Sequence, residues 1–313
     1  MTSEPTSTEL LAETTRSLGA MHRNQVHRDP WPALEAFDPA AYPEALRRHA
    51  AWHWMARARA EHGSVLQFSA VTHALTRARA PVEILGALAR LITDEVRHVE
   101  LCARTAEAFY PEAKSDEAPA DFFAWRAPKA PWRDAPKDDD RASLFAWASR
   151  AILTACCLGE TLSKPMLEAV ATVATDPLPR AAAEQILRDE QFHARFGWES
   201  LAVIAPRLDD GGRAALQEQL AKSLAGFERT TCGKVRIEDL AGSEMAIVPG
   251  EEADEPNLGT LSERQFAMIF YATLEHEIFP ALKELGLDPE AAWARRAGYP
   301  APKGREPAAE SRG

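Results

Sequence analysis

One short motif of acidic and imidazole side chains occurs twice in this chain. Residues 94–98 read DEVRH and residues 189–193 read DEQFH, so each copy contains Glu-x-x-His preceded by an aspartate. A further glutamate precedes each copy: Glu61 lies 34 residues before the glutamate of the first copy, and Glu160 lies 30 residues before that of the second. Four carboxylates and two imidazoles at this spacing are the ligand set of a dinuclear metal site in a four-helix bundle. The predicted ligands are Glu61, Glu95, His98, Glu160, Glu190 and His193.

Each of these glutamates falls within an apolar stripe of the helix predicted around it. The neighbours of Glu61 on its helix face, for example, include Ala58, Val65 and Phe68. A carboxylate is costly to bury in such surroundings unless it is paired or bound to a cation. Two divalent metals would balance the four carboxylates, and oxygen and imidazole ligands suit iron or manganese. The sequence therefore predicts two iron ions, with a manganese–iron pair as the alternative.

The aspartate that begins each motif has a predicted role beside the ligands. A histidine that binds a metal usually donates its other ring N–H to a carboxylate, which fixes its tautomer and orientation. We expect Asp94 to hold His193 and Asp189 to hold His98, so that the two pairs cross between the motif helices.

The remaining histidines are not expected to be ligands. His62 follows Glu61 directly, but it points about 100° away around the helix. His53, His73 and His276 have no partner at a matching distance. The four cysteines show no zinc-site spacing and are expected to be reduced core residues.

Proline and capping signals locate the helices that must position the six ligands. The predicted helices form two hairpins, at 43–80 with 82–110 and at 142–174 with 178–204. In an antiparallel pair, residues equidistant from the turn lie at the same height. The midpoint between the first two glutamates is residue 78 and that between the second two is residue 175, close to the breaks at Pro81 and Pro177. Each glutamate pair is therefore predicted to lie level across its own hairpin.

The predicted fold class is all-α: an antiparallel four-helix bundle of two hairpins, with extra N-terminal and C-terminal helices. We divide the chain into an N-terminal arm with a short helix (1–42), the bundle (43–228) with a long loop (111–141), a C-terminal extension (229–300), and a disordered tail (301–313). A shorter helix is expected at 212–227 and a last one at 262–285. Between them, 234–237 and 245–248 are the most strand-like pieces of the chain.

Composition limits the compartment and the partners. The chain has 313 residues and a net charge of −11, without a basic face of the kind that binds nucleic acid. The first 15 residues contain no apolar segment of signal-peptide length. No run approaches the roughly 20 apolar residues of a membrane span. We therefore expect a cytoplasmic protein that binds neither membrane nor nucleic acid; a homodimer is compatible with the sequence.

These motifs resemble those of the ferritin-like di-iron carboxylate superfamily over roughly residues 43–205. The string at 94–98 is similar to a run that supplies two ligands in bacterial multicomponent monooxygenases. Together with EHGS at 61–64 and GET at 159–161, the two motifs are also similar to a group of uncharacterised bacterial ferritin-like proteins. The resemblance implies the same six ligands and a ferritin-like bundle that holds the metals between its hairpins.

Three better-known types differ from this chain. Bacterioferritin-like chains are about half as long, and rubrerythrins add a Cys-x-x-Cys iron domain that this sequence lacks. Arylamine N-oxygenases carry an extra histidine four residues before the last ligating glutamate, where this chain has Ile186. The resemblance thus extends to the general class and not to these types.

The expected function is that of a dioxygen-dependent di-iron oxidoreductase: a monooxygenase or oxidase, with N-oxygenation as one form. It would oxidise or hydroxylate a small-molecule substrate with dioxygen and an external electron donor. Ferroxidase activity or iron handling is an alternative, although about 100 residues beyond the bundle fit iron storage poorly. Peroxide scavenging is another alternative. A hydroxylase acting on modified tRNA is a further one, which the acidic balance opposes.

Overall fold

The computed structural model describes residues 11–12, 14–114, 135–137, 140–241 and 255–299. Within these ranges every regular element is a helix, and no strand is present. The all-helical prediction is therefore confirmed, and the strand-like interpretation of 234–237 is wrong. Residues 234–236 form a turn and irregular backbone, and a 3₁₀ helix begins at Ile237 (Ile237–Leu240). Short β-branched runs have weak intrinsic strand preference when no partner strand is at hand. The second strand-like piece and the tail lie outside the described residues.

The first hairpin consists of α3 (Glu44–Arg77) and α4 (Val82–Phe109). Pro43 and Pro81 each stand directly before the first helical residue, where a missing backbone N–H costs nothing. The turn between the helices contains Arg79 in the left-handed region, with φ of 54°. These bounds agree with the predicted 43–80 and 82–110 to within the usual uncertainty of helix ends.

The second hairpin begins with three elements in one continuous helical rod, α5 (Arg141–Ile152), the π-helix η4 (Leu153–Glu160) and α6 (Thr161–Val173). The return helix is α7 (Pro177–Ile204), whose N-terminus is capped by the Asp176 carboxylate accepting from Leu178 N–H. The sequence predicts the whole of the first rod as one ordinary helix. The structure differs from this prediction in the π-helix, which ends at Glu160. Such segments are frequent at functional sites.

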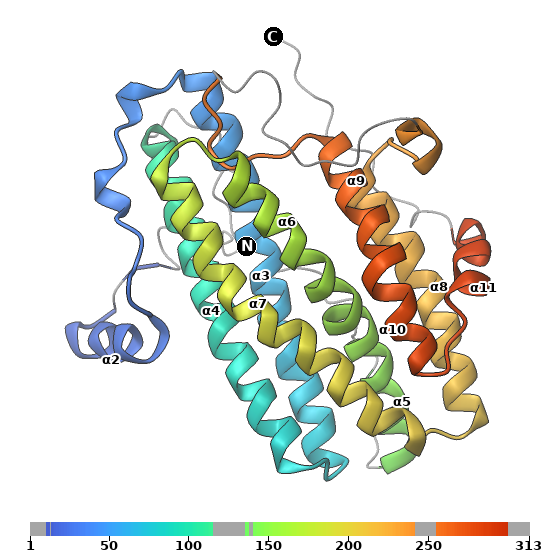
Figure 1. Ribbon diagram of the computed structural model, residues 1–313. Helices are drawn as coiled ribbons and strands as arrows, with labels where there is room; N and C mark the ends of the chain where they lie inside the picture. The colour runs from blue at the N-terminus through green and yellow to red at the C-terminus, as the bar shows by residue number, and fades with distance from the viewer. Residues whose placement is uncertain (1–10, 13, 115–134, 138–139, 242–254, 300–313) are drawn as a thin grey trace, which may run out of the picture.

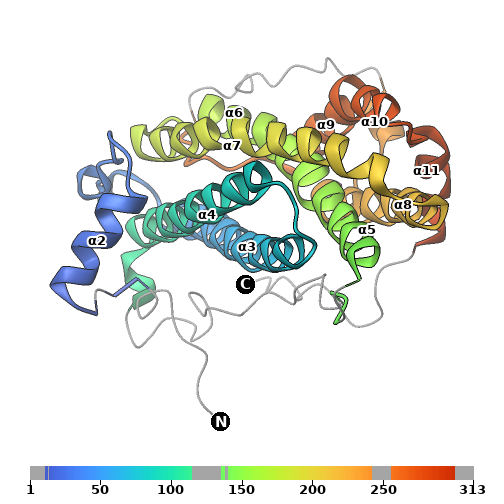
Figure 2. The same cartoon turned by 90° about the horizontal axis from the view of Figure 1, so that it is seen from below.

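The two hairpins lie side by side, with α4 packed against α7 and α3 against α5 (Figure 1). Seen along the helices, the α3–α4 pair and the α6–α7 pair form two adjacent layers (Figure 2). The C-terminal elements extend this core on the side of α5 and α6: α8 (Asp210–Cys232), α9 (Glu263–Thr273), the π-helix η7 (Leu274–Ile278), α10 (Phe279–Glu284) and α11 (Pro289–Arg295). The expected helices at 212–227 and 262–285 are thus present, the second of them interrupted by η7.

The N-terminal arm lies on the opposite side, against α4 (Figure 1). It contains α2 (Arg16–Val26) and two 3₁₀ turns, Leu34–Ala36 and Pro39–Ala41. The buried apolar residues form one cluster, which includes Phe37 of this arm and Ala292 of α11. The arm, the bundle and the C-terminal elements therefore share one hydrophobic core.

One helical stretch, Arg141–Val173, is long and apolar enough to cross a membrane by length and composition. The sequence-based expectation that no apolar run approaches a membrane span does not identify this stretch. However, 61% of its most apolar window is buried inside the structure, which is the pattern of a core helix in a soluble protein.

Candidate metal centre

The structure brings all six predicted ligands together in the middle of the bundle. Glu61 comes from α3, and α4 contributes the Glu-x-x-His pair of the first motif. Glu160 is the last residue of η4, and α7 contributes the pair of the second motif. Every one of the six is buried, and Glu95, His98, Glu190 and His193 have no exposed surface at all.

Both imidazoles face the two motif glutamates through the same ring atom. His98 Nδ1 lies 3.8 Å from Glu95 Oε2 and 3.8 Å from Glu190 Oε1. His193 Nδ1 lies 3.2 Å from Glu95 Oε1 and 3.8 Å from Glu190 Oε2. Glu95 and Glu190 are therefore shared between the two histidines, and Glu160 lies 3.9 Å from His193 Nδ1 on one side.

Ligand atoms from these side chains form three overlapping groups in which all atoms lie within 4.8 Å of one another. The groups are Glu95 with His98 and His193, Glu61 with His98 and Glu190, and Glu160 with Glu190 and His193. Buried glutamate and histidine clusters that could hold metal ions are thus present. Glu190, His98 and His193 each belong to two of the three groups, so the groups overlap.

The strongest evidence for bound cations is a set of buried polar atoms without partners. Both carboxylate oxygens of Glu95 and of Glu190 have no hydrogen-bond partner, nor do the Nδ1 atoms of His98 and His193. Leaving a buried polar group unsatisfied costs about 1–3 kcal/mol, and more when it is charged. All six atoms point to the same small volume, so cations held there would satisfy them together.

The electrostatics of the protein alone agree with this interpretation. Burial raises the pKa of Glu95 and of Glu190 well above the ordinary value, and the nearby Glu160 and Glu61 carboxylates raise both further. Burial lowers the pKa of His193, but the adjacent Asp94, Glu160 and Glu95 carboxylates outweigh it and raise that pKa well above the ordinary value. A metal must displace these protons, because it binds carboxylates and neutral imidazoles.

The two aspartates contact the other nitrogen of each ring in the crossed arrangement that the sequence predicts. His193 Nε2 lies 3.4 Å from Asp94 Oδ2, and His98 Nε2 lies 3.3 Å from Asp189 Oδ2. Each imidazole is therefore held between a carboxylate on its Nε2 side and the glutamates on its Nδ1 side. This fixes the ring orientation and leaves Nδ1 free for a metal.

Three arginines that the sequence analysis did not identify surround these aspartates. Arg97, which is 1% exposed, donates from Nη2 to Asp94 and to Asp189 Oδ2, the latter at 2.9 Å. Arg28, from the arm, donates to Asp189 Oδ1 at 2.5 Å and to Asp94 Oδ1 at 3.1 Å. Arg90 Nε lies 3.2 Å from Asp94 Oδ2. Arg90 and Arg97 could have been found from their helical spacing to Asp94, at four and three residues.

The adjacent histidines, together with this arginine cluster, keep the aspartates ionised. Burial alone would raise the pKa of Asp94, but the hydrogen bond to His193 and the charges of Arg97 and Arg28 bring it down to about 2. The pKa of Asp189 is also lowered, because its contacts with His98 and Arg97 outweigh the effect of burial. Both carboxylates are thus charged acceptors for the ring N–H groups at neutral pH.

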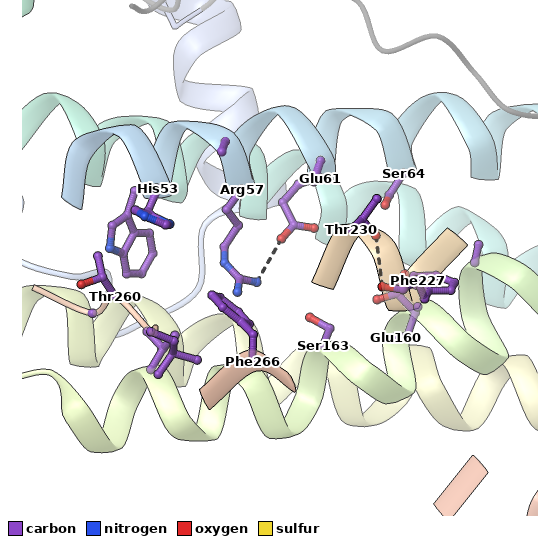
Figure 3. A pocket seen from close by; sticks show the side chains of 18 of the residues that line it. His53, Arg57, Glu61, Ser64, Glu160, Ser163, Phe227, Thr230, Thr260 and Phe266 are labelled. Atoms are coloured by element: carbon purple, nitrogen blue, oxygen red, sulfur yellow. Dashed lines mark hydrogen bonds and ion pairs between the residues drawn. The ribbon is translucent and has the colours of Figure 1, made fainter. Parts of the chain in front are cut away.

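A cavity of about 600 Å³ adjoins the centre on the side of α3 and η4. Figure 3 shows Glu61 and Glu160 at this cavity, with Arg57 and Ser163 beside them and Phe227 and Phe266 on the neighbouring helices. Its remaining wall comes from α8, α9 and residues 259–261. The C-terminal extension, whose place the sequence does not indicate, therefore completes a pocket next to the metal ligands.

The cavity contains few charges apart from the two glutamates. Arg57 Nη1 lies 3.7 Å from Glu61 Oε1, and its side chain keeps 21% of its surface exposed. Burial, with a smaller contribution from His49, lowers the pKa of His53, which is therefore neutral at pH 7. The buried Nε2 of Gln67, another lining residue, has no hydrogen-bond partner.

Four further histidines lie outside the groups of side chains that are close enough to share a metal, among the residues that the structure describes: His53, His62, His73 and His276. The four cysteines are buried free thiols, as expected. A different group, His22, His27 and Glu100, also brings metal-binding atoms together, and the sequence analysis did not identify it.

The chain matches no family model, no curated protein and no solved structure. The geometry and chemistry of the side chains themselves therefore indicate the metal centre.

Proposed function

We propose that the protein is a dinuclear iron oxidase or oxygenase with a ferritin-like bundle, which uses dioxygen to oxidise a small organic substrate. The observation that carries the proposal is the set of six unpartnered, fully buried donor atoms on Glu95, Glu190, His98 and His193. They come from two helical hairpins and converge between them. This donor set of carboxylates and imidazoles suits iron, or a manganese–iron pair.

Six side chains would hold the two ions. Glu95 and Glu190, each near both histidines, are placed to be shared, and Glu61 and Glu160 complete the donor set on the cavity side. Iron held there supplies one-electron redox chemistry with dioxygen.

The protein orients these ligands and excludes water from them. Asp94 and Asp189 accept from the Nε2 side of each ligand histidine, so that Nδ1 is available to the metal in a fixed tautomer. The zero exposure of Glu95, His98, Glu190 and His193 excludes bulk water from the reacting volume, which protects reactive species from side reactions.

The adjoining cavity supports substrate oxidation over ferroxidase activity or peroxide scavenging. Its volume of about 600 Å³ lies in the range of small-molecule sites, and it reaches Glu61 and Glu160 directly. Aromatic side chains such as Trp54 and Phe266 line it together with hydroxyls such as Ser163. Iron handling and peroxide turnover need no pocket of this size. An external electron donor would supply the reducing equivalents for repeated turnover.

The test begins with the metal content of the purified chain and the optical spectrum after ferrous loading and exposure to air. We expect two iron ions at this centre and near-ultraviolet absorption of an oxidised di-iron site. Glu95→Ala should lose metal, whereas Glu199→Ala, an exposed position on α7, should not. Unchanged loading in both Glu95→Ala and His193→Ala would rule out the proposal.

A loaded centre can then be assigned among the candidate activities. Turnover of an organic compound that depends on dioxygen supports the oxygenase. Rapid consumption of peroxide or of ferrous iron without any organic substrate would favour the alternatives.

A further inference from the structure

A second convergence of metal-binding side chains lies between the N-terminal arm and α4. His22, in α2, and His27, just after it, both approach Glu100 of α4. His22 Nε2 lies 2.7 Å and His27 Nε2 lies 2.9 Å from the same oxygen, Glu100 Oε2. Ligand atoms of the three side chains all lie within 4.8 Å of one another. Two imidazole nitrogens and one carboxylate oxygen are thus gathered around one point.

This group is separate from the dinuclear centre. Glu100 follows His98 by two residues, which turns it about 200° away around the helix. It therefore faces the arm, and it shares no side chain with the ligand groups between the hairpins. Glu100 is buried, with 6% of its side chain exposed, whereas His22 and His27 are 36% and 21% exposed. A cation from solution would reach the site from the side of the histidines.

Neighbouring residues hold the three side chains in place. Arg104 Nε donates to Glu100 Oε1 at 2.7 Å, which leaves Oε2 directed at the histidines. The ring of Trp31 stacks on His27 at 3.8 Å between centroids and 6° between planes. Hydrogen bonds to a ligating carboxylate and packing against a ligating ring are the usual supports of metal ligands. Both histidines direct Nε2 at the same oxygen, Glu100 Oε2, so that the three ligand atoms surround one point.

We propose that His22, His27 and Glu100 form a mononuclear site for a divalent transition metal such as Zn²⁺. Two imidazoles and one carboxylate are a known zinc ligand set when the fourth position is left for water or substrate. The three side chains provide no fourth ligand, and the site borders a cavity of about 620 Å³. Apolar side chains, including Leu18, Val96 and Val99, line that cavity. The ion would therefore keep an open position facing an apolar pocket.

A metal at this site would also hold the arm in place. His27 directly precedes Arg28, whose guanidinium contacts Asp94 and Asp189 next to the dinuclear centre. An ion bound by His22 and His27 of the arm and by Glu100 of α4 joins the two segments. It would thereby favour the position of the arm in which Arg28 reaches both aspartates.

The experiment counts metal ions in the full-length chain. Metal-free protein is saturated with Zn²⁺ or Co²⁺, passed through a desalting column and analysed for bound metal. If the dinuclear centre also fills, the wild type should retain three ions and the His22→Ala/His27→Ala double variant two. His73→Ala, an exposed histidine of α3, is the matched control and should retain three. If the dinuclear centre does not bind metal, the wild type should retain one ion and the double variant none. The two proposals can therefore fail separately.

A second variant separates metal binding from docking of the arm. Glu100→Gln keeps an oxygen that can accept from the histidines but removes the charge that a metal needs. It should lose the same single ion while its circular dichroism and thermal unfolding stay close to those of the wild type. Equal metal content in the wild type, the double variant and Glu100→Gln would overturn the proposal and leave the three side chains as a hydrogen-bonded contact of the arm.

Discussion

Arg28 of the N-terminal arm donates to Asp189 of α7 at 2.5 Å, although 161 residues separate them in the chain. Asp189 in turn lies against His98 Nε2. Arg28 also donates to Asp94, which lies against His193 Nε2. The arm therefore acts on the candidate metal centre through two carboxylates, without contributing a ligand of its own.

Replacing Arg28 tests this connection. Arg28→Ala removes a charge from both aspartates while Arg97 remains on them. We expect full metal loading with faster loss of metal to a chelator, by several-fold, because the histidines are oriented less firmly. Second-layer changes around metal ligands typically cost 10–100-fold in affinity. The release rate under a fixed chelator concentration measures the effect, and Arg195→Ala, an exposed arginine of α7, is the control. Identical release rates in the two variants would contradict the prediction.

Asp189→Asn should weaken metal retention more strongly than Arg28→Ala. The amide keeps the shape of the side chain but removes the negative charge beside His98 Nε2 and leaves Arg97 and Arg28 without that charge to pair with. We expect roughly 10–100-fold weaker retention, the usual size of such effects. Competition with a coloured chelator gives the affinity. Asp210→Asn, at an exposed position in the first turn of α8, should match the wild type.

Gly197→Ala should destabilise the fold. Gly197 lies where α7 passes the π-helix η4, and an added Cβ would be 2.6 Å from Cys156 Cβ and 2.8 Å from Cys157 N. Because backbone atoms of η4 are among those contacts, the helices must separate, at a cost of about 1–3 kcal/mol in the free energy of unfolding. Gly86→Ala in α4 meets nothing within 4 Å and should instead stabilise by about 0.5–1 kcal/mol. Chemical denaturation of both variants measures the difference in sign.

Arg57→Gln should affect substrate binding and not metal content. A cation bound to Glu61 would neutralise the carboxylate that pairs with Arg57. The Arg57 guanidinium, which lies in the cavity wall, could then donate hydrogen bonds to an acceptor on the substrate. We expect a raised KM for an acidic substrate, by about 10-fold for one lost charged hydrogen bond of roughly 1.5 kcal/mol. Neutral substrates of the same shape should show little change. Steady-state kinetics of the iron-loaded protein measures the two KM values. A KM for the acidic substrate that is the same in the variant and in the wild type would contradict the prediction.

The sequence indicated the centre well because its information is local. Glu95 and His98 are three residues apart on one helix, and proline and capping signals fixed where the two hairpins turn. When long helices have clear proline and capping signals at their ends, these signals largely determine which residues lie at the same height in a hairpin. The proximity of the six predicted ligands could therefore be predicted from the sequence. Their assembly also depends on the packing of α4 against α7.

The features that the sequence did not reveal depend on long-range packing. Nothing near Arg28 in the sequence refers to residues 94 or 189, and the contact exists only because the arm folds back over α4. The π-helix η4 left no clear mark either. Pro165, a proline inside the same rod, lies in α6 beyond the end of η4. Likewise, the C-terminal helices were expected from periodicity, but their position beside the cavity follows from contacts that no local pattern encodes.

The long separation between Arg28 and its partners has a consequence for the order in which the protein assembles. Arg28 is synthesised before both of its partners: Asp94 follows 66 residues later and Asp189 161 residues later. The arm therefore cannot dock completely until the part of α7 that carries Asp189 has emerged from the ribosome.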